Sequence, residues 1–172
     1  MSEARELIKE MGLIAASDKL QASEDNDCVV RALMHTLGIT YAESHHLCET
    51  KLNRHPGCGV HTNIYLPRIK QSHGKKINQL GNASANDNGL RLTRTKLSKV
   101  TILRNWKQKF VKQRKEVQVN YKVKGFIKAH PIGTYFVTVR RHAIAIIDGK
   151  IIGNWNDELK INREVISAYR IG

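Results

Sequence analysis

The spacing of apolar residues changes along the chain, and this change limits the folds open to it. In the first third, apolar side chains recur every three or four positions, as on one face of a helix. In the last third they alternate, as in strands. Helices that precede an antiparallel sheet are typical of an α+β domain. The expected helices lie at 2–16, 28–37 and 41–52, and the expected strands at 117–123, 134–139, 143–147 and 151–152. Residues 97–111 could form a short strand followed by a basic helix.

Two of these helices have boundary signals in the sequence. Gly38 follows the helix at 28–37, at the position where a left-handed residue commonly ends a helix. Thr40 is expected to cap the helix at 41–52, and Glu43 stands three residues later, which is the spacing of a capping box. The first part of the chain therefore predicts two consecutive helices with a short link.

Cys28 begins the first of these two helices, directly after the polar turn 22–27. The positive end of the helix dipole and the free backbone N–H groups there favour a thiolate. The same N–H groups, with a side-chain amide nearby, could stabilise an oxyanion. Gln21 and Asn26 are the amides available, and Asp27 is expected to cap the helix or shape the turn.

His142 opens the alternating apolar run 142–147, far from Cys28 in sequence. A thiol nucleophile and its base need to be close in the fold and not in the sequence. A lone cysteine at a helix start and a histidine on a distant strand therefore predict a catalytic pair.

A third residue is expected to orient the imidazole. A three-residue loop, with Ile146 paired to Lys150, would place Asn154 opposite His142, whereas a two-residue Asp-Gly loop would place Trp155 there. Asn154 is the preferred third residue, and Asp157 is the alternative if the strand bends.

These residues resemble the papain-like cysteine peptidase superfamily. The resemblance rests on Asp27-Cys28 before a helix, the strand 133–139, His142 and the Asp148-Gly149 hairpin. It covers roughly residues 20–50 and 130–158. The most similar members are the bacteriocin-processing peptidase domains of transporters and small phage-encoded papain-like proteins. The motif at 25–32 is also similar to that of ovarian-tumour-type deubiquitinases, although Ile144 stands where their third triad residue lies.

The resemblance implies a single papain-like domain over 1–172, in which N-terminal helices pack on a C-terminal antiparallel sheet. Its parts would be the nucleophile helix and the following helix (18–53), a basic segment (91–128) and a histidine-bearing sheet (132–158). It implies a cysteine peptidase or related thiol acyl-transfer hydrolase with a Cys-His-Asn triad. The expected partner is a protein or peptide substrate, with no cofactor and no metal.

The basic segment 91–128 points to an alternative function. It holds 13 Lys or Arg residues and one acid, Glu116, in a chain of net charge +14. Such a segment attracts polyanions. The alternative is an inactive papain-like scaffold that acts as a phage protein and binds nucleic acid or an acidic protein, with Cys28 only structural. Its candidate contacts are Arg104, Lys107, Lys109, Lys112, Arg114 and Lys115.

Zinc is a further alternative, because Cys48, His55, Cys58 and His61 have the side chains that zinc prefers. The spacing of the first two matches no known finger, so structural zinc is the weaker hypothesis. Three cysteines, an odd number, argue for a reducing compartment. No apolar run approaches the roughly 20 residues of a membrane helix. The expected location is the cytoplasm, or the host cytoplasm or virion if a phage encodes the chain.

Overall fold

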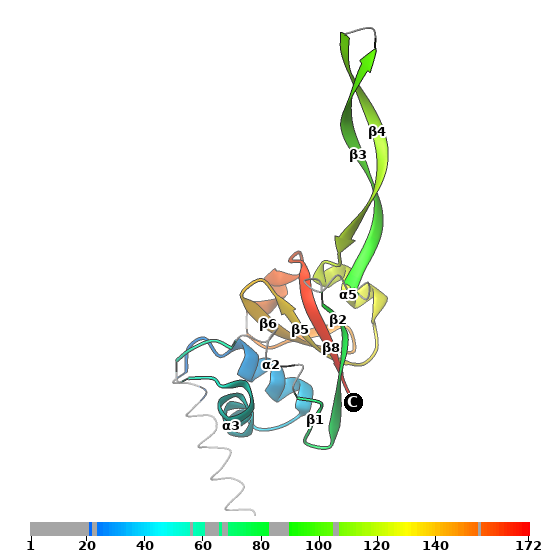
Figure 1. The fold of residues 1–172 in the computed structure, drawn as a ribbon. Helices are drawn as coiled ribbons and strands as arrows, with labels where there is room; N and C mark the ends of the chain where they lie inside the picture. The colour runs from blue at the N-terminus through cyan, green and yellow to red at the C-terminus, as the bar shows by residue number, and fades with distance from the viewer. Residues whose placement is uncertain are drawn as a thin grey trace, which may run out of the picture.

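The computed structural model describes residues 21, 24–55, 57–60, 66, 69–82, 90–104, 107–154 and 156–172. Figure 1 shows a body of helices and sheet from which one long hairpin projects. The described helices are α2 (Cys28–Leu37), α3 (Tyr41–Leu52), α5 (Val123–Ala129) and the 3-10 helix η4 (Asp157–Lys160). The described strands are β1 (Gln71–Ser72), β2 (Lys75–Asn82), β3 (Arg91–Arg104), β4 (Lys107–Asn120), β5 (Thr134–Val139), β6 (His142–Ile147), β7 (Lys150–Ile152) and β8 (Val165–Ile171).

The body is built around a six-stranded sheet in the order β1-β2-β8-β5-β6-β7. All neighbouring strands in it are antiparallel. The last strand, β8, is inserted between β2 and β5, so the chain ends in the middle of the sheet. Helices combined with an antiparallel sheet confirm the predicted α+β class.

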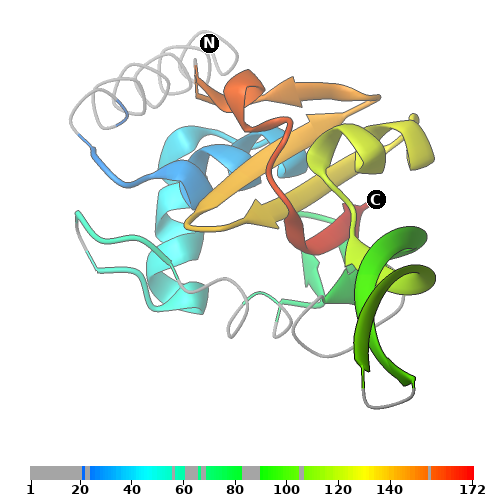
Figure 2. The ribbon, with the colours of Figure 1, turned by 90° about the horizontal axis from the view of Figure 1, so that it is seen from above.

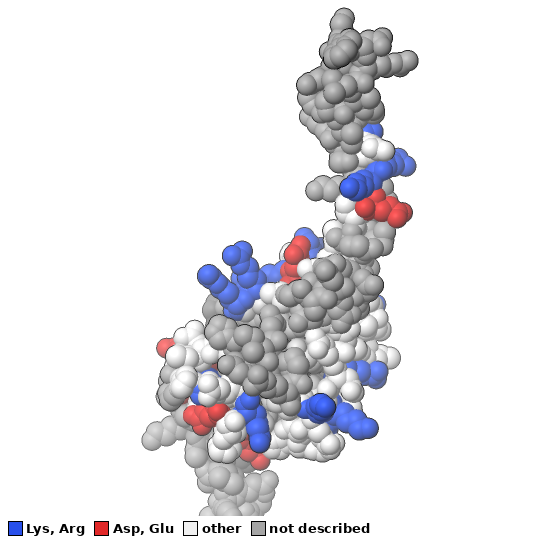
Figure 3. All heavy atoms as spheres, viewed as in Figure 1, with Lys and Arg blue, Asp and Glu red and all other residues white. Residues whose placement is uncertain are grey.

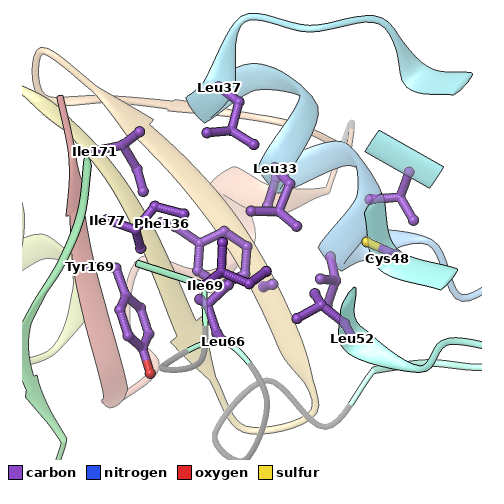
Figure 4. Close-up of a cluster of buried hydrophobic side chains, with 14 of the residues drawn as sticks. Leu33, Leu37, Cys48, Leu52, Leu66, Ile69, Ile77, Phe136, Tyr169 and Ile171 are labelled. Atoms are coloured by element: carbon purple, nitrogen blue, oxygen red, sulfur yellow. The ribbon is translucent and has the colours of Figure 1, made fainter. Parts of the chain in front are cut away.

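Both faces of this sheet are covered by helices. Figure 2 shows α2 and α3 on one face and α5 on the other. On the first face, Leu33 of α2 and Leu52 of α3 pack with Phe136 and Tyr169 of the sheet (Figure 4). On the second face, Phe126 of α5 belongs to a separate cluster with residues of β5, β6 and β8. Because both sides are buried, β5 and β6 are almost continuously apolar instead of alternating.

The boundaries predicted for α2 and α3 are confirmed. Gly38 adopts the left-handed conformation after α2, and its N–H donates to the carbonyl of Met34 at 2.9 Å. Thr40 and Glu43 form the capping box at the start of α3, with both reciprocal hydrogen bonds present. Local signals determine these two helices, and α2 then lies against β6.

The prediction for the basic segment is wrong. Residues 97–111 suggested a short strand and a basic helix, but β3 and β4 form a two-stranded hairpin that pairs continuously from Arg91↔Asn120 to Arg104↔Lys107. Thr and Val at alternating positions favour strand over helix, and the Lys and Arg residues between them do not mark a helix. The hairpin projects from the body beside α5 (Figure 1).

Other segments also differ from the predicted ones. The alternating pattern expected to continue to 123 ends at Asn120, and Val123 begins α5 instead. Strands β2 and β8 were not predicted. The helix expected at 2–16 lies outside the described residues. None of the described helices is long and apolar enough to cross a membrane.

Candidate active site

Cys28 is the first residue of α2, and its position is fixed by the residue before it. Asp27 is buried, and its Oδ2 accepts hydrogen bonds from Arg31 Nε at 2.7 Å and from the Tyr41 hydroxyl at 2.9 Å. The side chain makes no cap hydrogen bond, so the predicted capping role of Asp27 is wrong. It instead ties the turn to α2 and α3. Burial, and then the Asp27 carboxylate, raise the pKa of Tyr41, which keeps its hydroxyl a donor.

A buried ionic cluster anchors the turn further upstream. The Arg54 side chain is fully buried, and its Nη2 donates to Glu24 Oε2 at 2.7 Å. Its Nη1 donates to His45 Nε2, also at 2.7 Å. The hydrogen bond from Arg54 holds the pKa of Glu24 below its usual value. The segment that leads to Cys28 is therefore fastened to the end of α3 by a buried charge pair.

The cluster predicts a stability effect. Replacing Arg54 by leucine should lower the free energy of unfolding by about 3 kcal/mol, because it leaves the Glu24 carboxylate without its partner. Urea unfolding at pH 7 measures this loss. Lys51→Leu, at an exposed position of α3, is the control and should change the free energy by less than about 0.5 kcal/mol. Equal stability of the two variants would contradict the anchoring role of Arg54.

His142 begins β6 and lies where that strand meets the start of α2. Its Nε2 is 2.5 Å from Asp157 Oδ1. The hydrogen bond to Asp157, and then the nearby Cys28 sulfur, outweigh burial and raise the pKa of His142 to about 9. Because Asp157 engages Nε2, Nδ1 is the ring nitrogen left to face the thiol. At neutral pH the imidazole therefore carries its proton between a carboxylate and a sulfur.

Asp157, and not Asn154, is the residue that contacts His142. The predicted three-residue loop is wrong: Ile147 pairs with Lys150, and Asp148 and Gly149 form a two-residue turn with positive φ angles of 47° and 75°. The strand β7 then ends at Ile152. The chain turns back into η4, which presents Asp157 with a side chain only 3 % exposed.

Asn154 contributes to the site through its backbone. Its N–H donates to Asp157 Oδ2 at 2.9 Å, so one carboxylate oxygen is held by this N–H and the other faces His142. Asp157 had been the alternative in the sequence prediction. The strand register alone did not predict the bend after β7, which brings Asp157 to His142.

Gly153 makes room for the Asp157 carboxylate. Its φ is 155°, and a Cβ placed there would collide with Asp157 Oδ2. Gly153→Ala should therefore displace the carboxylate and lower the pKa of His142 toward the ordinary 6.5. NMR titration of the His142 ring measures this pKa. Gly59→Ala, at a position where a Cβ meets nothing, is the control. A His142 titration unchanged by Gly153→Ala would contradict this role.

Cys28 and His142 both line an open cleft of about 900 Å³. One wall comes from Asn26, Cys28 and the segment 57–60, and the other from the ends of β5 and β6. Asn26 lines the cleft, and its Nδ2 donates to the Gly57 carbonyl at 3.2 Å; its oxyanion role stays a prediction. Gln21 does not line the cleft. Its backbone carbonyl accepts from Arg31, so no contact supports it as an oxyanion residue.

The cleft also contains residues that the sequence did not single out. Arg141, Thr138 and Ile166 line it, and so does Cys58, an exposed second thiol that the sequence offered only as a zinc ligand. Their positions depend on the turn between β5 and β6 and on the insertion of β8. Only the turn residues Arg140-Arg141, between two apolar runs, leave a signal in the sequence.

The three described zinc candidates, Cys48, His55 and Cys58, do not form a metal-binding group. Cys48 is fully buried in the apolar core (Figure 4), and burial raises its pKa to about 12, whereas Cys58 is exposed in the cleft. His55 is exposed, and His61 lies outside the described residues. Within the part of the chain that the structure describes, no group of three or more His, Cys, Asp or Glu could hold a metal ion.

The predicted polyanion contacts lie on the projecting hairpin. Lys112, Arg114 and Lys115 are exposed on β4. Arg104 pairs with Lys107 at the last register position, and Lys109 pairs with Ile102. The hairpin thus carries all six of these residues on its two strands, separate from the cleft.

Neither a family model, nor a curated protein, nor a solved structure matches this chain.

Proposed function

We propose that this protein is a papain-like cysteine hydrolase or acyl transferase with a Cys28-His142-Asp157 triad. The observation that carries the proposal is the position of His142 between the buried Asp157 carboxylate and Cys28, which begins a helix and opens on a cleft. A helix-terminal thiol, a base and a residue that orients the base are the parts required for nucleophilic catalysis by cysteine. The papain-like assignment follows from this helix packed on the sheet that bears the histidine.

The reaction would begin when Cys28 Sγ attacks the carbonyl carbon of an acyl substrate. The new C–S bond pushes charge onto the carbonyl oxygen, which the Cys28 backbone N–H and the Asn26 amide would stabilise, since both residues line the cleft. His142 then gives its proton to the leaving nitrogen or oxygen as the bond to carbon breaks, and a thioester remains on Cys28. Water or another nucleophile loses a proton to His142, attacks the thioester and returns the thiol.

Asp157 would keep Nε2–H of His142 in place and stabilise the imidazolium. This assignment replaces the asparagine of the expected Cys-His-Asn triad. A carboxylate binds an imidazolium more strongly than an amide does, since the hydrogen bond is charge-assisted. The raised pKa of His142 agrees with that role.

Trapping of the thioester tests the proposal. The protein is incubated with the p-nitrophenyl ester of an N-acetylated amino acid, quenched with acid and digested, and the acyl group is located by mass spectrometry. The expected result is an early burst of nitrophenol and an acyl group on Cys28. Cys58 serves as an internal control, because it is an exposed thiol of the same cleft. Equal acylation of the two cysteines, or none on Cys28, would exclude the proposed reaction.

A second candidate function, nucleic-acid binding, is favoured by the β3–β4 hairpin. Its 14-residue strands extend about 45 Å, and like charges stand directly opposite each other across the ribbon. Like-charged cross-strand pairs are unfavourable unless an anion neutralises them. The pairs of this kind are Lys96↔Lys115, Lys99↔Lys112 and Arg104↔Lys107.

Both faces of the ribbon would meet phosphates. Alternate residues of a strand point to opposite faces, so the exposed Lys112 and Lys115 lie on different faces. The major groove of duplex DNA admits a two-stranded ribbon and has phosphates along both walls. An acidic protein surface would contact one face only. Nucleic-acid binding by the hairpin is compatible with acyl transfer in the cleft.

Salt dependence tests this second function. A fluorescent 20-base-pair DNA duplex is titrated with wild type and with the variant Lys112→Gln/Arg114→Gln/Lys115→Gln. Affinity should fall steeply with salt, with a log–log slope of about −0.9 per phosphate contacted, and the variant should show a shallower slope. Cys28→Ala should bind like wild type. An affinity that is indifferent to salt would contradict this function.

A further inference from the structure

A second cavity, of about 800 Å³, lies next to the proposed catalytic cleft. The two cavities share Arg141, His142 and Ile166, so together they run from the Cys28 thiol past the His142 imidazole. The second cavity is strongly basic. Four cationic side chains and one carboxylate line it, together with Asn120 at the foot of the hairpin: Arg140, Arg141, Lys160, Arg163 and Glu164. We name this second cavity the cationic groove.

Three segments line the groove: the end of β4 at Asn120, the turn 140–141 and the segment 160–164, and the four cations come from the last two. Arg140 and Arg141 form the turn between β5 and β6, and Lys160 ends η4, the same short helix that presents Asp157. Arg163 precedes β8 and donates from Nη1 to the Arg140 carbonyl at 3.1 Å, which fastens two of the segments together. Figure 3 shows Lys and Arg side chains gathered at the end of the body from which the hairpin projects.

Arg141 occupies a backbone conformation that favours other residues. Its φ is 58°, in the left-handed region where glycine and asparagine are the common choices for a tight turn. An arginine there costs conformational energy that glycine would avoid. Arg141, the residue before His142 in sequence, lines both cavities. A role in binding would explain why an arginine stands at this position.

The charges of the groove are not neutralised from within. Among the described residues, none of the four cations forms an ion pair with a carboxylate, and Glu164 provides a single negative charge for the whole groove. Three of the four, Arg140, Arg141 and Arg163, are exposed at its mouth. Unpaired cations around a concave surface concentrate anions there.

We propose that the cationic groove binds an acidic peptide segment of the substrate and so presents the adjacent acyl group to Cys28. The inference rests on the proposed acyl-transfer function. A peptide fits better than a nucleic acid for two reasons. It carries the carbonyl group that a thiolate attacks, and its backbone N–H groups can donate to Glu164, whereas a run of phosphates would meet repulsion there.

Protection of Cys28 from alkylation tests the proposal. The full chain is treated with iodoacetamide at low ionic strength, alone and with acetyl-tetraglutamate amide or acetyl-tetraglutamine amide, and the labelling rate of Cys28 is followed by mass spectrometry. Tetraglutamate should slow labelling and tetraglutamine should not. The double variant Arg141→Asn/Lys160→Gln should weaken protection about tenfold, because two screened charge pairs are lost. Asparagine is chosen because it tolerates the left-handed conformation at 141.

The matched control is Lys70→Gln/Lys76→Gln, which removes the same charge. Lys70 precedes β1, Lys76 lies on β2, and both are exposed. It should keep full protection by tetraglutamate. Equal protection by both peptides, or equal loss in both double variants, would overturn the proposal. Protection by an eight-residue thymidine oligonucleotide in place of tetraglutamate would overturn it in favour of a nucleic acid. The labelling rate without peptide reports on the thiol itself, so a failed acyl-transfer function is recognised separately.

Discussion

Replacing His142 by alanine is expected to slow acyl transfer to Cys28 at pH 7 by about 10⁶-fold, the scale of loss seen when the histidine of a catalytic triad is removed. The imidazole lines the cleft with the thiol and is the general base of the proposed triad. Without it, the thiol has no partner to take its proton and the leaving group has no acid. The measurement is the burst rate with the p-nitrophenyl ester.

Cys28→Ala is the reference variant without a nucleophile and should abolish the burst. Cys28→Ala should unfold at nearly the wild-type urea concentration, because Cys28 is half-buried. His142→Ala should unfold at a lower urea concentration, because it leaves the buried Asp157 carboxylate without its partner. A burst that survives in His142→Ala at more than a tenth of the wild-type rate would show that another residue acts as the base.

Replacing Asp157 by asparagine should have the next largest effect, a loss of about 10⁴-fold in the acylation rate. The amide cannot stabilise an imidazolium as a carboxylate does, and it can hold the ring in the wrong tautomer. The matched control is Asn154→Ala. Asn154 contacts Asp157 through its backbone N–H, which alanine retains, so this change should alter the rate by less than about threefold. The opposite ranking would restore Asn154 as the third residue of the triad.

Asp157→Asn should also change how stability depends on pH. The pKa of His142 is about 9 in the folded chain, above the ordinary 6.5. The folded state thus binds the proton more tightly than the unfolded state. This contribution is fully present below pH 6.5 and is lost as the pH rises through about 9. In Asp157→Asn the pKa of His142 should fall, and the loss of stability between pH 6.5 and 9 should shrink. Urea unfolding at the two pH values measures it.

Local signals allowed part of the fold to be predicted. The start and end of α2 and α3 follow from Gly38, Thr40 and Glu43, whose effects depend on neighbours within one helical turn. The strands β5 and β6 follow from apolar runs of β-formers. The strand β8 could not be predicted in the same way, because its place between β2 and β5 depends on residues about 90 positions apart.

The candidate site was predicted to the extent that each part is marked locally. Cys28 follows a polar turn at a helix start, and His142 opens a strand, so their types and spacing pointed to each other. The prediction of the third triad residue depended on whether the turn after β6 has two residues or three. A two-residue Asp148-Gly149 turn shifts the register, and the bend at Gly153 then presents Asp157. The cationic groove needed three distant segments to be placed together.

The hairpin shows a different limit of sequence analysis. Charge composition correctly marked 91–128 as a basic segment, but charge does not distinguish a helix from a strand. Its alternation of Thr and Val with Lys and Arg fits a ribbon that is exposed on both faces. The predicted basic helix and the observed ribbon would both attract polyanions. They differ in the shape that is presented to the partner.

The measurement that tests the central claim most directly is the alkylation rate of Cys28 by iodoacetamide as a function of pH, in wild type and in His142→Ala, with Cys58 of the same molecule as the reference thiol. If Cys28 and His142 form a thiolate–imidazolium pair, Cys28 should label rapidly at pH 6, well below the roughly 8.5 at which a free thiol ionises. In His142→Ala its rate should follow the pH curve of Cys58. Slow labelling of Cys28 at pH 6, unchanged by the loss of His142, would contradict the account.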